Sequence, residues 1–187
     1  MDIYTDELSQ KFLMSHTALM PMRQVNLPRG AYLQRYFAGS FNDKDVWIHR
    51  FLSNDSEQHL HNHGFEFKTI MLRGRYVEEY RSQEDGKTHS RITTAVHTPM
   101  SMTWWLTHLP SLEYAHGRHI DVFDWHRIVE ADPETWTALI VPRKRIPMWF
   151  FKDDNGKLEG VNSSPADWWK YYKVRPDSGV AVDDNRF

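Results

Sequence analysis

The sequence contains no cysteine in 187 residues. Disulfide bonds, thiolate metal sites and cysteine nucleophiles are therefore excluded, and any bound metal must be held by His, Asp or Glu. The chain also lacks an apolar run long enough to span a membrane, and its first residues are polar and acidic, unlike the start of a signal peptide. We therefore expect a cytoplasmic protein that does not bind membranes.

A strong excess of charge of one sign is also missing. The 23 basic and 25 acidic residues leave a net charge of −2, so the broad basic surface of a nucleic-acid-binding protein is not expected. Hydrophobic residues make up 40% of the chain, which is enough to build a core, and the length suits one domain. We expect a small-molecule substrate as partner, no nucleic acid, and leave a homodimer open.

Many short β-forming segments alternate with turn residues between residues 45 and 152. This spacing is typical of an all-β sandwich or barrel. Residues 1–44 are expected to add a helix and a lead-in strand that pack on the barrel, with the helix running from Thr5 to about His16. Residues 153–187 are expected to form a short helix near Asp167–Tyr172 and a tail. Within the barrel, Met100–Leu106 is predicted to be a strand.

Histidine, by contrast, is abundant, and three of the 11 histidines stand at alternate positions: His59, His61 and His63. Side chains on a strand alternate between its faces, so these three imidazoles would point the same way. Imidazole is the commonest protein ligand of transition metals near neutral pH. The pattern predicts a metal site, completed by a histidine from a distant segment.

The segment His61-x-His63, followed by a carboxylate at Glu66 and by Gly74, resembles the first motif of the cupin superfamily. Trp125-His126 is similar to the second motif. The resemblance implies a double-stranded β-helix, or jelly-roll, cupin barrel with short flanking helices and a metal inside its mouth. It also implies the metal ligands His61, His63, His126 and Glu66. One divalent transition metal ion is expected, with Fe(II) favoured and Mn, Ni or Zn left open.

Two questions about the motif stay open: which pair of histidines binds the metal, and what Glu66 does. Glu66 stands one residue earlier than the family pattern places its carboxylate, and pairing His59 with His61 in place of His63 would correct that spacing. On an uninterrupted strand Glu66 would face away from His61 and His63. A bulge at Gly64 would bring it back to the metal. Glu66 is therefore either a direct ligand or a hydrogen-bond acceptor that orients a ligand imidazole.

Other histidines compete with His126 for the third ligand position, namely His97, His108, His116 and His119. His119-Ile120-Asp121 also fits the beginning of the triad of many 2-oxoglutarate oxygenases. That triad needs a distant later histidine, and His126 follows too closely to serve. We therefore reject the 2-oxoglutarate interpretation.

Cupins with such sites include dioxygenases, isomerases and epimerases, so the fold does not select one reaction. The favoured function is a metal-dependent cupin enzyme, a mononuclear non-haem dioxygenase or oxygenase acting on a small anionic organic substrate. The alternatives are a cupin isomerase or epimerase and a non-catalytic cupin ligand-binding protein. Because arginine binds carboxylates and phosphates bidentately, substrate binding is assigned to four arginines near the predicted mouth: Arg73, Arg75, Arg143 and Arg145.

Overall fold

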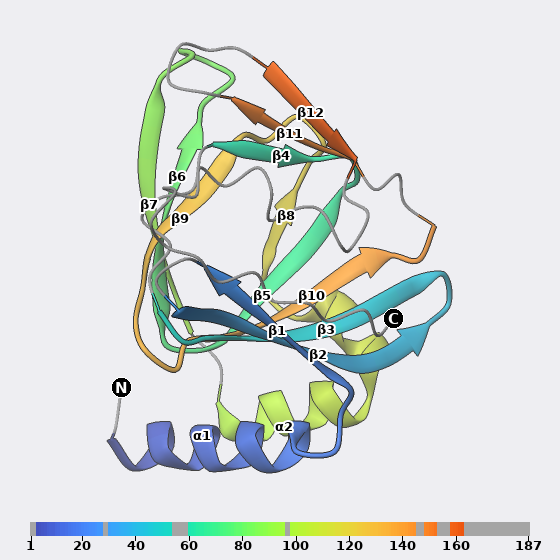
Figure 1. Cartoon of the computed structure of the whole chain (residues 1–187). Helices are drawn as coiled ribbons and strands as arrows, with labels where there is room; N and C mark the ends of the chain where they lie inside the picture. The colour runs from blue at the N-terminus through green and yellow to red at the C-terminus, as the bar shows by residue number, and fades with distance from the viewer. Residues whose placement is uncertain are drawn as a thin grey trace.

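The computed structural model describes residues 3–27, 30–53, 60–95, 98–144, 148–152 and 158–162. Two six-stranded antiparallel sheets face each other (Figure 1). The first contains, in order, β1 (Met22–Leu27), β2 (Gly30–Phe41), β3 (Lys44–Phe51), β10 (Trp136–Pro142), β5 (Phe67–Arg73) and β8 (Arg118–Ile120). The second contains β12 (Leu158–Asn162), β11 (Met148–Lys152), β4 (His61–His63), β9 (His126–Ala131), β6 (Arg75–Arg81) and β7 (Thr88–Thr94).

The pairing of the central strands defines the topology. Strand β3 pairs with β10, β4 with β9, β5 with β8, and β6 with β7, all antiparallel. The chain from β3 to β10 is thus one long hairpin with its tip between β6 and β7. Successive pairs of this hairpin fall alternately in the first and the second sheet, which is how a jelly roll wraps. The all-β jelly roll predicted from the sequence is confirmed.

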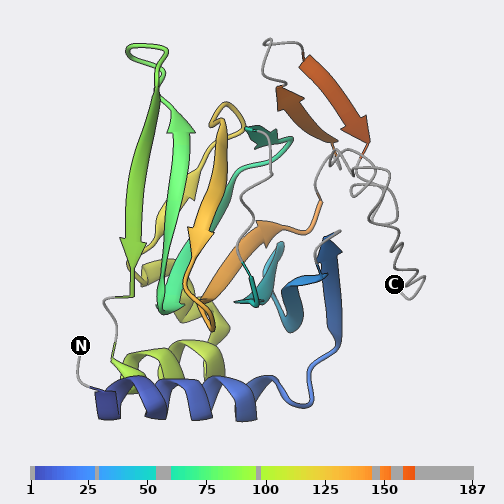
Figure 2. The same cartoon turned by 60° about the vertical axis from the view of Figure 1, so that its left-hand side comes forward.

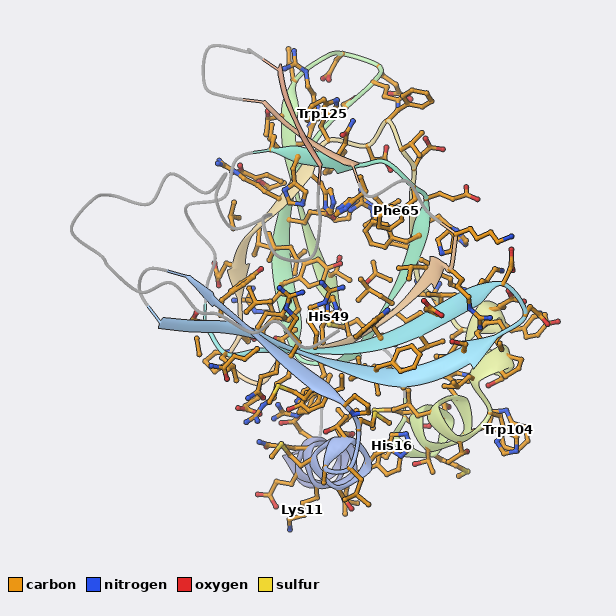
Figure 3. All side chains as sticks on the ribbon, turned by 45° about the vertical axis from the view of Figure 1, so that its right-hand side comes forward. Lys11, His16, His49, Phe65, Trp104 and Trp125 are labelled. Carbon is orange, nitrogen blue, oxygen red and sulfur yellow. The ribbon has the colours of Figure 1, made fainter. Side chains whose placement is uncertain are left out.

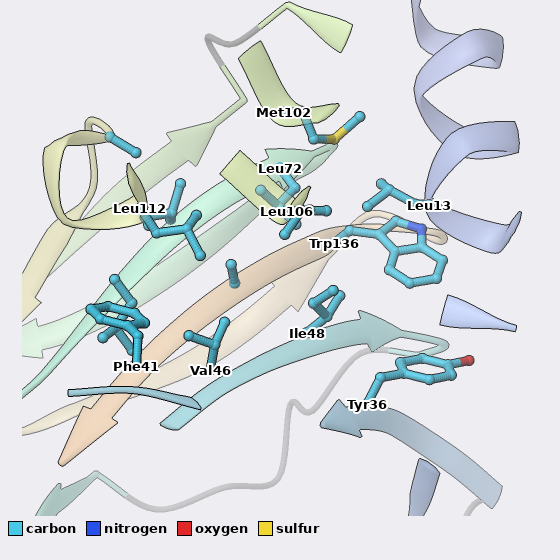
Figure 4. Close-up of a cluster of buried hydrophobic side chains, with 14 residues drawn as sticks. Leu13, Tyr36, Phe41, Val46, Ile48, Leu72, Met102, Leu106, Leu112 and Trp136 are labelled. Carbon is cyan, nitrogen blue, oxygen red and sulfur yellow. The ribbon is translucent and has the colours of Figure 1, made fainter. Parts of the chain in front are cut away.

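Three helical segments cover the outer face of the first sheet (Figures 1 and 2). They are α1 (Ile3–Thr17), α2 (Pro99–Thr107) and the 3₁₀ helix η1 (Leu109–Tyr114). The main hydrophobic core lies between these helices and the sheet (Figure 4). Leu13 of α1 and Met102 and Leu106 of α2 pack there against Trp136, which is completely buried.

Strand β3 is buried on both faces. Val46 and Ile48 belong to the core under the helices, whereas Phe51 belongs to a cluster with Met71 and Tyr76 of β5 and β6. Because side chains alternate along a strand, Trp47 and His49 share the face of Phe51. The interior of the barrel is therefore lined by the odd-numbered residues of β3.

The segment Met100–Leu106, expected to be a strand, lies in α2, so this prediction is wrong. Thr98 caps the helix, because its hydroxyl accepts a hydrogen bond from the Ser101 amide at 3.2 Å. Pro99 then occupies the first turn, where a missing N–H costs nothing. Met102 and Leu106 stand one helical turn apart and are both buried, so packing on the sheet holds the helix.

The N-terminal helix is present as α1, and the expected lead-in strand is two strands, β1 and β2, which extend the first sheet. The predicted helix at Asp167–Tyr172 falls outside the described residues. None of the helices in the described part of the chain is long and apolar enough to cross a membrane.

Gly74 makes the turn between β5 and β6 with a φ of +78°, a backbone conformation that favours glycine. A Cβ at this position would lie 2.5 Å from the Thr135 hydroxyl oxygen and 3.0 Å from the Thr135 Cα. The turn thus has no room for a side chain. It directs β6 back along β9, which brings residues of β6 to the site described next.

Candidate metal centre

The structure brings three of the predicted ligands together inside the barrel. His61 and His63 lie on β4, and His126 is the first residue of β9 and the direct cross-strand partner of His61. One ligand atom from each imidazole lies within 4.8 Å of the other two. The three side chains are 6–7% exposed. In the described part of the chain, this is the group of His, Asp and Glu residues that fits a metal ion.

The closest approach in the cluster joins two ring nitrogens. Nε2 of His63 lies 3.0 Å from Nε2 of His126. Two nitrogens bound to one ion at about 2.1 Å, at right angles, would be separated by about 3.0 Å. A proton shared between the two rings would give the same separation, but it would make no use of the third imidazole nearby. The donor set and its spacing therefore fit one transition metal ion.

A buried carboxylate fixes the orientation of His126. Oε1 of Glu78, in the middle of β6, lies 2.6 Å from Nδ1 of His126, and Glu78 is 1% exposed. The same oxygen accepts a hydrogen bond from Arg118 of β8. Because an ionised carboxylate only accepts, Nδ1 of His126 carries the proton and donates it. In a neutral His126, Nε2 then carries no proton, and its lone pair is available to bind a metal ion within the cluster.

The ionisation states suit a metal site. Burial raises the pKa of Glu78, but the hydrogen bond and charge of His126 and the Arg118 guanidinium outweigh it and hold this pKa below its usual range. Burial lowers the pKa of His63 well below the ordinary histidine value, assisted by His61, His126 and Arg35. Near neutral pH the cluster thus offers a neutral imidazole at His63 and an ionised carboxylate behind His126.

Glu66 is not part of this group. It lies exposed in the loop between β4 and β5, and its charge acts on Lys44, a residue of β3 that pairs with Glu113 on the helical side of the first sheet. The structure therefore places Glu66 away from the imidazoles, as the parity of the strand suggested. The carboxylate that contacts one of the three imidazoles is Glu78, a residue not predicted from the sequence.

The alternative histidines lie elsewhere. His108, His116 and His119 are exposed, and His108 stacks on Trp104 of α2. His59 and His97 fall outside the described residues. Of the histidines whose surroundings the structure describes, His126 joins the His61–His63 pair.

Three of the four arginines assigned to substrate binding lie in the described residues, and each of these has other partners. Arg73 ends β5 on the side of α1, where it binds Asp6 and the carbonyl of Glu134. Arg75 begins β6, at the opposite end of that strand from Tyr80, which is the cross-strand neighbour of His126. Arg143 pairs with Asp45, and its side chain is 52% exposed. Arg145 lies outside the described residues.

The surroundings of the histidines are partly apolar and partly polar. His63 contacts the rings of Phe65 and Phe67, and these belong to a cluster that also contains Ile120, Val141, Leu139 and Trp47. His49, from β3, points into the space between the sheets (Figure 3). It accepts a hydrogen bond from Arg35 of β2. Neither Arg35 nor His49 was singled out from the sequence.

No family model matches the sequence, and no curated protein matches it. Solved structures with a similar fold include a cupin-2 domain from Rhodospirillum rubrum, with 10% identity, a TM-score of 0.49, and 73% of this chain and 78% of that chain covered. The Fe(II) form of HppE, with the alternative substrate (S)-1-HPP, shows 7% identity and a TM-score of 0.43 over 67% of this chain and 57% of its own. The capsular polysaccharide assembling protein CapF from Staphylococcus aureus shows 14% identity and a TM-score of 0.44 over 74% of this chain.

These likenesses concern the fold alone. The chain spans about a third of CapF, 34% of its length, and 57% of HppE. The jelly-roll fold is assigned independently of them, from the wrapped hairpin that runs from β3 to β10. The chain folds as a jelly-roll barrel, with a buried three-histidine cluster between its sheets.

Proposed function

We propose that this protein is a metal-dependent enzyme, a mononuclear non-haem oxygenase that acts on a small organic acid. The observation that carries the proposal is the mutual distance of the three imidazole donor atoms, all within 4.8 Å in a buried setting. When bound, a divalent metal with three protein ligands keeps open positions that admit oxygen and substrate and polarises what binds there. His61, His63 and His126 would hold it, and Glu78 keeps His126 in the binding tautomer.

The interior offers little for metal-free acid–base chemistry. Efficient proton transfer needs a group whose pKa lies near the working pH. Burial raises the pKa of Tyr76 to about 12, Glu78 is engaged by His126 and Arg118, and burial lowers the pKa of His49. In the described interior, the reaction thus depends on what the histidine cluster binds. This supports a reaction that uses a metal bound by the cluster.

The apolar wall supports an organic substrate. Phe65 and Phe67 lie against His63, so a molecule bound beside the cluster would lose water on that side. Exclusion of water strengthens the electrostatic interactions in a site and protects reactive species from hydrolysis. The surroundings of the cluster therefore suit a molecule with an apolar body.

Oxygen uptake tests the proposal. The protein is purified without a histidine tag, loaded anaerobically with Fe(II), and mixed with oxygenated buffer and a panel of small aliphatic and aromatic acids. We expect uptake that depends on one class of acid and that is absent from the His61→Ala/His63→Ala variant. A fully loaded protein that consumes no oxygen and returns each acid unchanged would contradict the oxygenase and leave a ligand-binding cupin. An isomerised acid would identify an isomerase.

A further inference from the structure

A single carboxylate oxygen joins the two sheets beside the histidine cluster. Glu78 belongs to β6 of the second sheet, and its Oε1 atom lies 2.6 Å from Nδ1 of His126. The same atom accepts a hydrogen bond from Nη1 of Arg118, which begins β8 at the edge of the first sheet. The side chains of Arg118 and Glu78 are 13% and 1% exposed. The contact is therefore a buried ion pair that reaches from one sheet to the other.

The two donors leave the second oxygen of Glu78 unused. An arginine frequently binds both oxygens of a carboxylate at once, whereas here Arg118 and His126 both bind Oε1. In the described part of the chain, Oε2 of Glu78 is buried without a hydrogen-bond partner. A buried polar atom without a partner costs free energy, so packing alone would favour the bidentate pair. The observed arrangement instead holds one oxygen of Glu78 against the imidazole.

Several contacts give Arg118 a fixed position. Its backbone pairs with β5, and Gly117 before it lies so close to β5 that a Cβ atom would be 2.6 Å from a carbonyl oxygen of that strand. The guanidinium carbon lies 5.9 Å from the centre of the Tyr80 ring, and Nη2 lies 3.9 Å from Oδ2 of Asp124. The guanidinium is thus held independently of Glu78 and can itself hold the carboxylate.

We propose that Arg118 is a positioning residue of the metal centre. It fixes Glu78 so that Oε1 accepts the Nδ1 proton of His126, and Nε2 of that imidazole is left for the ion. A carboxylate behind a ligand imidazole fixes the tautomer and the orientation of the ring, and Arg118 extends this support to the opposite sheet. The inference rests on the proposed function, because it names a residue on which metal binding depends.

An alternative role for Arg118 is to anchor the turn that precedes His126. Asp124 belongs to that turn, and its Oδ2 atom also accepts a hydrogen bond from the Asp121 amide at 3.1 Å. The Asp124→Asn variant separates the two roles. Asparagine keeps an acceptor for the Asp121 amide but removes the charge that faces Arg118.

A matched control is available on the same strand. Glu79 follows Glu78, so its side chain lies on the other face of β6, where it pairs with Arg127 at 2.6 Å. The Arg127→Met variant therefore breaks a similar ion pair of β6 without touching Glu78.

Zn(II) affinity and the ring nitrogens of His126 test the proposal. The variants are Arg118→Met, Arg118→Lys, Glu78→Gln and the double variant Arg118→Met/Glu78→Gln. Affinity is measured by competition with a chelator, and circular dichroism verifies folding. Nitrogen NMR of the metal-free protein distinguishes a protonated from an unprotonated ring nitrogen, and the His126→Gln spectrum assigns the signals.

We expect Arg118→Met to weaken Zn(II) binding about 10–100-fold and to mix the two tautomers of His126 in the metal-free protein. Arg118→Lys, which keeps a charged donor, should restore most of the affinity and the wild-type ring signals. Because Arg118 acts through Glu78, the double variant should bind Zn(II) no more weakly than Glu78→Gln alone. Asp124→Asn and Arg127→Met should keep the wild-type affinity and ring signals.

If Arg118→Met does not fold, Arg118→Gln replaces it, because glutamine keeps a neutral donor for Glu78. We expect a smaller loss of Zn(II) affinity in this variant and the same absence of a further loss when it is combined with Glu78→Gln.

Wild-type affinity and ring signals in the folded neutral variant would overturn the proposal, as would losses that add up in the double variant. A loss in Asp124→Asn equal to that in the Arg118 variant would identify a turn anchor instead. These failures are distinct from failure of the proposed function. Zn(II) binding that depends on Arg118, in a protein that consumes no oxygen with any acid, would remove only the oxygenase. Oxygen uptake by a protein whose affinity and ring signals do not depend on Arg118 would remove only the positioning role.

Discussion

Glu78 and His126 come from neighbouring strands and meet at 2.6 Å between Oε1 and Nδ1, in the interior of the barrel. The carboxylate that orients His126 thus comes from the middle of β6, twelve residues after Glu66. Arg118 holds the same carboxylate from β8. Two residues on two further strands, Glu78 and Arg118, therefore support the imidazole of His126.

The Glu78→Gln variant tests this support. Glutamine keeps the size of the side chain but removes the charge that keeps Nδ1 of His126 protonated. Loss of such a partner typically weakens metal binding about 10–100-fold, and we expect that loss in a Zn(II) competition titration. Glu79→Gln is the matched control, because Glu79 is the next residue and pairs with Arg127, away from the cluster. Equal affinity in the two variants would mean that Glu78 does not act on the metal.

Glu66→Gln should leave metal affinity unchanged. Glu66 is exposed in the loop after β4, and its charge acts on Lys44 rather than on the imidazoles. The same competition titration measures it beside Glu78→Gln. A steep loss of affinity in Glu66→Gln would show that the loop rearranges to bring this carboxylate to the metal.

The histidines were predictable and Glu78 was not, for a physical reason. The period of two in β4 and the later His126 follow from strand geometry and a long-range motif. In β6, however, Glu78 and Glu79 are adjacent carboxylates on opposite faces, and nothing local tells which face is buried. That choice is made by the packing of β6 between β9 and β7.

The contact between Arg35 and His49 could not be predicted from the sequence either. They are separated by 13 intervening residues and become partners only through the register of β2 on β3. Helix α2 was mispredicted for a different reason. Its start signals, Thr98 and Pro99, were present in the sequence. The β-forming residues that follow favoured a strand, and tertiary packing of Met102 and Leu106 overrode that preference.

Arg73→Met should reduce stability and leave ligand binding unchanged. The Arg73 side chain is 11% exposed and binds Asp6 of α1 at 2.7 Å and the carbonyl of Glu134 at 2.6 Å. Losing these hydrogen bonds should cost about 1–3 kcal/mol, measured by urea unfolding. Arg143→Met, at an exposed pair, should cost less than about 1 kcal/mol. Weaker carboxylate binding in Arg73→Met would restore the substrate role predicted from the sequence.

Stability should fall on mild acidification. Burial lowers the pKa values of His49 and His63 in the folded protein, whereas histidines in an unfolded chain titrate near pH 6.5. Above that pH neither state is protonated and stability is complete. As the pH falls below about 6.5 the unfolded chain takes up protons first, and each one destabilises the fold by about 1.4 kcal/mol per pH unit.

Thermal unfolding of the metal-free protein measures this dependence of stability on pH. The His49→Gln variant separates the contribution of His49 from that of His63. Glutamine at position 49 keeps a hydrogen-bond acceptor for Arg35 but does not titrate. We expect a shallower decline of the melting temperature between about pH 6.5 and about pH 5 in this variant. A melting temperature of the wild-type protein that is constant over this range would refute the buried, neutral state of the two histidines.

The central claim is that His61, His63 and His126 hold one divalent metal ion, and metal binding to a histidine variant tests it most directly. Wild-type protein without a tag, the His61→Ala/His63→Ala variant and a control with His108→Ala/His119→Ala at exposed positions are titrated with Fe(II), Mn(II), Ni(II) and Zn(II). The account predicts about one ion per chain for the wild type and the control, and none for the double variant with its circular dichroism spectrum retained. Failure of the wild type to bind any of the four ions, or wild-type binding by the double variant, would contradict it.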